Sequence, residues 1–219
     1  MNVLPLHQPA ILSRLTREFF DRPVMDNALR GYWCEAMVAE ALGPQCRITS
    51  ANWAPWDLEI GPEVDDFPTR IRLQVKNSAC RQTWHGATSQ PSDCLFSMTW
   101  RQCPAYWTRD FPHRPCEAAG FLCDVFVLCH HPGFDEPDLD QGDPSQWLVY
   151  LVSARPETRA FTANELARLR AGREGQARRS IQRKPKSLLE GRMGSAGVAP
   201  IPMTQLTLQS VRDALGLAQ

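Results

Sequence analysis

Apolar side chains recur at helical spacing in two stretches near the N-terminus. In residues 9–20 they occupy one face, and the run ends before Pro23. This spacing predicts an amphipathic helix. A second helix is predicted over residues 27–42, with Asp26 as its N-cap and Gly43 as its C-terminal stop.

The second predicted helix carries a carboxylate inside its apolar stripe. Glu35 lies in the middle of that stripe, which comprises Ala28, Tyr32, Val38, Ala39 and Leu42. A buried carboxylate is costly unless it has a partner or a metal ion. We therefore expect Glu35 to have one of the two.

Strict alternation of polar and apolar residues follows. After a short strand predicted near residues 47–50, the segments 56–60 and 70–78 both alternate, so they are predicted to pair as an antiparallel hairpin. In this hairpin the apolar side chains share one face of the sheet. The opposite face carries Asp57, Gln74 and Lys76.

Farther along the chain the pattern is uneven. Residues 80–115 have no clear period, although 91–102 suggests a short helix. Two apolar runs, 121–129 and 147–153, predict buried strands on either side of an acidic loop.

The C-terminal part combines helical signals with a linker. A capping box at residues 162–165 predicts a helix through about Arg170. Residues 194–202 are typical of a linker, and 206–217 predict a strand end followed by a short helix.

Composition supports one globular domain with an appended segment. The chain has 219 residues, 43% of them hydrophobic, which is enough apolar side chain for a sizeable core. It contains no apolar run of the roughly 18 residues that a membrane span needs, and its first residues lack the basic stretch and apolar core typical of a signal peptide. We expect a soluble cytoplasmic protein that does not bind membranes.

The zero net charge hides two segments of opposite sign. Residues 135–143 contain five acids and no base, whereas residues 168–192 contain nine bases and two acids, a net charge of +7. The basic segment is either a solvated helix face or loose tail, or an arm that contacts phosphates. In the second interpretation its nucleic-acid-binding residues are Arg178, Arg179, Arg183, Lys184 and Lys186.

Eight cysteines leave two interpretations open. Without an export signal they are expected to be reduced thiols in the core. The alternative is a zinc-containing interaction module, although the spacing matches no common zinc motif. Its ligands would come from Cys116, Cys123, Cys129, His130 and His131.

The segments RGYWCEAMVAEALG, WDLEI and IRLQVKNS together resemble the PD-(D/E)xK nuclease superfamily. The resemblance covers about residues 25–155, and the Q-x-K variant is similar to that of group I intron-encoded homing endonucleases. It implies an α/β fold with a restriction-endonuclease-like core, in which helices flank a central mixed β-sheet. The expected parts are an N-terminal helix (1–24), a nuclease-like core (25–166), and a basic segment with linker and C-terminal helix (167–219).

The same resemblance implies a metal-dependent endonuclease that hydrolyses DNA. Glu35, Asp57 and Gln74 match the positions that hold Mg²⁺ or Mn²⁺, and Lys76 matches the lysine that assists the attacking water. Hard cations prefer oxygen ligands, and an ammonium group can offset charge that builds up on a phosphate. Double-strand cutting needs two sites, so a homo-oligomer, a dimer or higher, is expected.

Other interpretations of the same residues stay open. Asp57 and Glu59 are also compatible with a solvated strand face, and Lys76 with a charge that protects an edge strand. Ser78 either contacts a phosphate or hydrogen-bonds to its own backbone. Gln74 stands where an acid is typical, so the alternative function is a catalytically inactive DNA-binding or assembly subunit.

Overall fold

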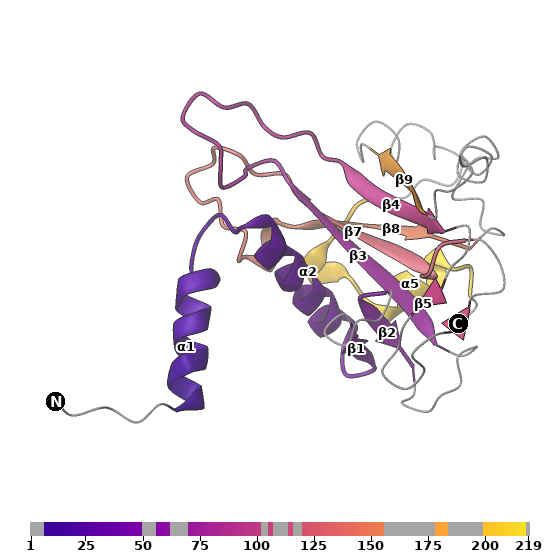
Figure 1. Cartoon of the computed structure of the whole chain (residues 1–219). Coiled ribbons are helices and arrows are strands. Elements are labelled where there is room, and N and C mark those ends of the chain that lie inside the picture. Colours follow the sequence, from indigo (N-terminus) through magenta and orange to yellow (C-terminus); the bar gives the residue numbers. More distant parts are fainter. Residues whose placement is uncertain are drawn as a thin grey trace.

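A six-stranded mixed β-sheet forms the centre of the molecule, and helices lie against it (Figure 1). This architecture is seen in a computed structural model. The predicted α/β class with a mixed sheet and flanking helices is confirmed. The structure describes residues 7–49, 56–61, 70–101, 105–106, 114–115, 120–155, 178–183 and 199–217.

The strand order of the sheet is β1-β2-β3-β7-β8-β10. Strands β3 and β7 are parallel, and all other neighbours are antiparallel. The bounds are β1 Cys46–Ile48, β2 Leu58–Ile60, β3 Ile71–Ala79, β7 Val125–His131, β8 Leu148–Ser153 and β10 Ile201–Pro202. The predicted hairpin is therefore confirmed as β2 and β3, in which Leu58 lies opposite Leu73.

Two predicted strands are displaced along the chain. The strand expected near 47–50 is β1, which begins at Cys46, and the strand expected at 121–129 is β7, which continues to His131. The end of β7 is set by pairing with β3, where Ala79 is opposite His131. The local pattern of apolar residues therefore could not predict where β7 ends.

Two small sheets accompany the central one. Strand β4 (Phe96–Arg101) pairs with β9 (Arg178–Arg183), and β5 (Ala105–Tyr106) pairs with β6 (Arg114–Pro115). The short helix expected at 91–102 was therefore wrong. The partner of β4 lies about 80 residues away in sequence, so a local pattern could not indicate this strand.

The principal helices are α1 (Gln8–Phe19), α2 (Asn27–Leu42) and α5 (Leu208–Ala214). All three were predicted. Two short 3₁₀ helices, η3 (Pro144–Gln146) and η6 (Met203–Gln205), lie in connections. The predicted helix at 162–170 and the boundary between residues 166 and 167 lie outside the described residues.

Helix α2 begins and ends as its sequence predicts. The Asp26 carboxylate accepts a hydrogen bond of 2.9 Å from the backbone N–H of Ala28. Gly43 has a φ of 81°, which favours glycine, and its N–H bonds back to the carbonyls of Ala39 and Glu40.

The buried face of α2 differs from the predicted stripe. Ala28 is exposed and Tyr32 is 62% exposed, whereas Glu35 is half-buried. Which side chains of α2 are buried depends on where the sheet lies beside the helix, and not on the apolar stripe alone. The buried side chains are Arg30, Cys34, Met37, Val38 and Leu42.

Two apolar clusters cover the two faces of the sheet. The first joins Cys34 and Val38 of α2 to Leu73 and Val75 of β3, and it also includes residues of α5. The second joins Phe96 and Met98 of β4 to residues of β7 and β8. The list of its buried members is Phe96, Met98, Cys123, Phe126, Leu128, Tyr150 and Val152.

The two faces separate the proposed zinc ligands. Cys129 belongs to the cluster under α2, and Cys123 belongs to the cluster under β4, so no single ion could bind both. Cys116 lies outside the described residues. Within the described ranges no group of three or more His, Cys, Asp or Glu side chains could hold a metal ion. The described members of this cysteine group therefore fit core packing better than a zinc module.

Candidate functional site

Asp57, Gln74 and Lys76 lie together beside the start of β2, at the end of the hairpin away from its connecting segment. The Asp57 Oδ2 accepts a hydrogen bond from the side-chain amide of Gln74 and one of 2.8 Å from the backbone N–H of Val75. Gln74 and Lys76 are opposite Phe126 and Leu128 of β7, which belong to the cluster under β4. These polar side chains therefore occupy the sheet face that β4 partly covers.

The backbone of Asp57 is held by both neighbouring strands. Its N–H donates to the carbonyl of Leu73 over 2.9 Å, and its own carbonyl accepts from the N–H of Thr49 over 2.8 Å. The carboxylate is therefore placed by the sheet rather than by a free loop. Such placement favours a preorganised site.

Two opposing influences act on the pKa of the Asp57 carboxyl. Burial raises the pKa of Asp57, and the Lys76 ammonium is the largest influence that lowers it. The hydrogen bonds from Val75 and Gln74 also favour the charged form. A buried carboxyl with an ammonium beside it is a common feature of functional sites.

Oxygen ligands for a cation are available around Asp57. In a strand the N–H and C=O of one residue point to the same side, and the N–H of Val75 faces Asp57. The Val75 carbonyl therefore also faces the end of β2. Together with the Asp57 carboxylate, and with the Gln74 amide oxygen once that amide is turned so that Nε2 no longer faces Asp57, this gives a set that hard divalent ions accept.

Glu35 does not lie with these side chains on one face of the sheet. Helix α2 packs on the face that carries Leu73 and Val75, whereas Gln74 and Lys76 point to the other face. The described contacts bring Asp57, Gln74 and Lys76 together, and Glu35 lies on the helix that covers the other face.

Two further carboxylates on this face are held by arginines. Glu59 is 6% exposed and contacts Arg47 at 3.2 Å and Arg70 at 3.1 Å, and the Trp56 indole N–H donates to it over 2.8 Å. The solvated strand face considered for Glu59 is therefore wrong. Glu59 is a structural anchor.

Asp124 is a buried, ion-paired carboxylate that the sequence interpretation missed. Its carboxylate accepts from the backbone N–H of Arg72 over 2.8 Å and from the Arg72 guanidinium over 3.0 Å. Arg155 adds a contact of 3.4 Å. The sequence feature that could have indicated this residue is its position as an acid within the apolar run 121–129.

Ser78 is buried, with 7% of its surface exposed. It lies opposite His130, whose Nδ1 is 2.8 Å from the Cys94 sulfur. This burial leaves Ser78 little surface for the predicted contact with a phosphate.

The described part of the basic segment, β9, lies on the side of the sheet that carries Asp57. Arg178, Arg179 and Arg183 lie on β9, which pairs with β4, and β4 packs on the same sheet face as Gln74 and Lys76. Figure 1 shows β4 and β9 beside the central strands. Lys184 and Lys186 lie outside the described residues.

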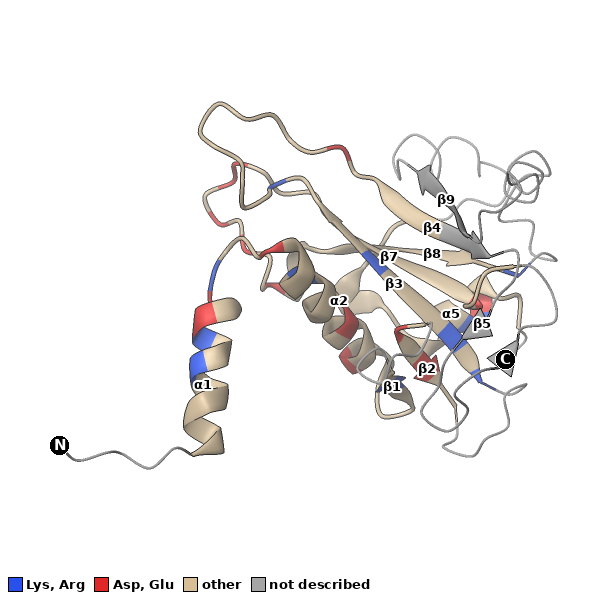
Figure 2. Ribbon diagram, viewed as in Figure 1, with Lys and Arg blue, Asp and Glu red and all other residues tan. Residues whose placement is uncertain are grey.

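Figure 2 shows basic residues on β3 and acidic residues on α2 and β2. Among the described parts of the chain, no helix has the length and apolarity that a membrane span requires.

Comparisons with protein-family models, with curated proteins and with solved structures gave no match to this chain.

Proposed function

We propose that this chain is a metal-dependent endonuclease that hydrolyses DNA phosphodiester bonds, with a Q-x-K variant of the PD-(D/E)xK site. The observation that carries the proposal is the convergence of Asp57, Gln74 and Lys76 on one sheet face. The parallel pairing of β3 and β7 beside an antiparallel β1-β2-β3 unit is compatible with a restriction-endonuclease-like core.

In this proposal Asp57, Gln74 and the Val75 carbonyl would hold Mg²⁺ or Mn²⁺. Such an ion supplies charge neutralisation at the phosphate and lowers the pKa of bound water. Gln74 now donates through Nε2 to Asp57, so a turn of its amide would present Oε1 instead. Glu35 is left out of the ligand set because α2 covers the opposite face.

Lys76 has a separate role in the proposal. Its ammonium orients water and offsets the negative charge that develops on the phosphate. The bases of β9 lie on the same side of the sheet and supply contacts to the DNA backbone.

Cleavage of plasmid and linear DNA in Mg²⁺ or Mn²⁺ tests the proposal. Wild-type protein is expected to cut, whereas Asp57→Ala and Lys76→Ala are expected to lose at least about 100-fold in rate, as is typical for loss of a metal ligand or a charge-stabilising group. Asp213→Ala, at an exposed position on α5, is the matched control. A wild-type protein that cuts no DNA with either ion contradicts the proposal.

A second candidate function is an inactive DNA-binding or assembly subunit with the same fold. The converging set contains a single carboxylate, Asp57, which favours weak metal binding. Salt-sensitive DNA binding together with no detectable Mn²⁺ binding in calorimetry would select this candidate over the enzyme.

A further inference from the structure

Helix α1 presents an apolar stripe that the rest of the molecule does not cover. None of its residues is buried, and Figure 1 shows the helix standing clear of the sheet. An exposed stripe of this kind marks an interaction surface more often than a solvent-facing helix. Its large apolar side chains are Ile11 (47% exposed), Leu12 (54%), Leu15 (43%) and Phe19 (45%).

A groove with apolar walls lies close to the C-terminal end of α1. It has a volume of about 500 Å³ and runs along α2, with η3 and η6 on its other side. The residues that line it are Trp33, Ala36, Met37, Glu40, Ala41, Pro144, Met203, Thr204 and Leu206.

The dimensions of the helix and the groove agree. From Trp33 to Ala41 the α2 wall rises about 12 Å, and from Leu12 to Phe19 the stripe of α1 rises about 10 Å, at about 1.5 Å per residue. Two turns of one helix therefore match two turns of the other, as in ordinary helix packing.

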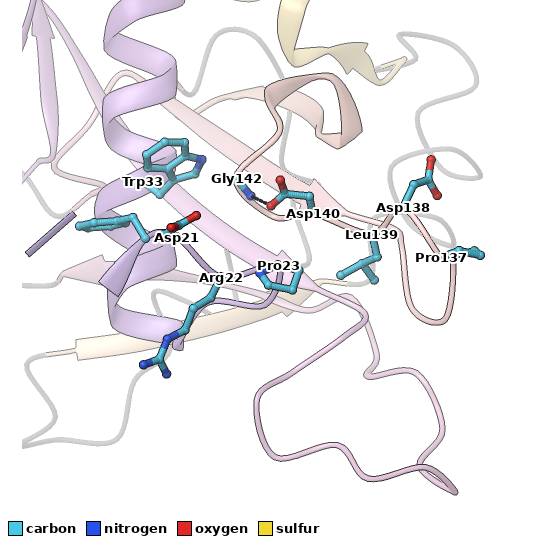
Figure 3. A pocket seen from close by; sticks show the side chains of 10 residues that line it. Asp21, Arg22, Pro23, Trp33, Pro137, Asp138, Leu139, Asp140 and Gly142 are labelled. Atoms are coloured by element: carbon cyan, nitrogen blue, oxygen red, sulfur yellow. Dashed lines mark hydrogen bonds between the residues drawn. The ribbon is translucent and has the colours of Figure 1, made fainter. Parts of the chain in front are cut away.

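The junction after α1 is fixed, and Phe20 at its start packs on Trp33 of the groove, with the ring centroids 5.7 Å apart. The Pro23 carbonyl accepts from the backbone N–H of Gln141 over 2.9 Å, and the Met25 N–H donates to the Gln141 side chain over 2.9 Å. Gln141 is completely buried. Figure 3 shows Arg22 and Pro23 of this junction beside the loop that carries Leu139 and Asp140.

The two surfaces carry net charges of opposite sign. Helix α1 has Arg14 and Arg17 against Glu18, with which Arg17 forms an ion pair. The groove contains Glu40 and ends at Pro144, next to the acidic loop 135–143, which has no base. Opposite net charges favour the approach of one surface to the other.

We propose that the α2 groove binds α1 of a second copy of this chain, and that the exchange is reciprocal. Each copy then gives one helix and receives one, so the contact closes as a two-fold dimer. This inference does not rest on the proposed nuclease activity. It requires only that the apolar stripe of α1 in one copy pack into the α2 groove of the other copy.

Light scattering after size-exclusion chromatography of the full chain gives the first test. The expected mass is twice 24.7 kDa. Leu12→Asp on α1 and Ala36→Arg in the groove, both at exposed positions, should each weaken the dimer at least about tenfold. Ser13→Asp, on the opposite side of α1, should leave the dimer unchanged.

Three results would overturn the proposal. These are a monomeric wild-type chain, an Ala36→Arg variant that dimerises normally, and a Ser13→Asp variant that is as weak as Leu12→Asp. Circular dichroism of each variant verifies that the fold is retained.

A cross-link gives the second test and identifies the surface that α1 contacts. Benzoylphenylalanine at position 15 should, on irradiation, attach to α2 within residues 33–41 of another copy and give a covalent dimer in a denaturing gel. A cross-link within one chain, or to any other surface, contradicts the reciprocal exchange.

Discussion

The side-chain amide of Gln74 donates a hydrogen bond to Oδ2 of Asp57, across the pair of strands that forms the β2–β3 hairpin. The bond places an amide where the related nuclease pattern has a second acid. Asp57 is therefore the sole carboxylate of the converging group, and its ionisation controls the charge of the site.

Replacing Gln74 by Glu should increase affinity for divalent ions. Two adjacent carboxylates repel each other without a cation and are both satisfied by one. Calorimetric titration with Mn²⁺ is expected to show binding at least about tenfold tighter for Gln74→Glu than for wild type. Equal or weaker binding would mean that position 74 does not face the ion.

The raised pKa of Asp57 predicts a specific dependence of stability on pH. Because burial raises this pKa, the folded protein holds the proton more tightly than the unfolded chain does. The contribution of Asp57 is thus greatest below its unfolded pKa of about 3.9 and is lost as pH rises through the folded value. Asp57→Asn should therefore raise the melting temperature at pH 7 to 8 and give little gain at pH 3. A uniform gain at all pH values would contradict this explanation.

Loss of Lys76 should change Asp57 as well as activity. The ammonium lowers the pKa of Asp57, so Lys76→Met is expected to raise that pKa further. NMR titration of the Asp57 carboxyl measures the shift, and DNA cleavage measures the loss of rate. If the Asp57 titration is the same in both proteins, the two side chains do not interact as described.

Glu35 tests the division of the site by the sheet. Since α2 lies on the face of Leu73 and Val75, Glu35→Gln is expected to leave cleavage within about threefold of wild type, unlike Asp57→Asn. Cleavage assays of both variants at equal Mg²⁺ make the comparison. A loss for Glu35→Gln as large as that for Asp57→Asn would return Glu35 to the ligand set.

Asp124 should matter for stability more than for chemistry. It joins Arg72 of β3 to Arg155, which follows β8, and removal of one partner from a largely buried ion pair costs roughly 3 kcal/mol. Urea unfolding of Asp124→Ala should show a loss of this order, and Asp124→Asn a smaller one. Asp213→Ala, at an exposed position, should change the free energy of unfolding by less than about 0.5 kcal/mol.

Several elements could be predicted because their signals are local. The caps of α2 and the alternation of β2 and β3 depend on residues close together in sequence, and the structure confirms them. The misses depend on distant partners. Strand β4 needs β9, and the exposure of Tyr32 follows from the direction in which the sheet lies.

The sequence by itself determined the helices, the hairpin and the shared face of Asp57, Gln74 and Lys76, because strand alternation has a period of two that residue order alone sets. Only the tertiary structure decided on which side of the sheet α2 packs, and with it the separation of Glu35 from that face. It also decided the burial of Ser78 and the pairing of Asp124 with two arginines. These features depend on contacts between residues far apart in the chain, which no local period records.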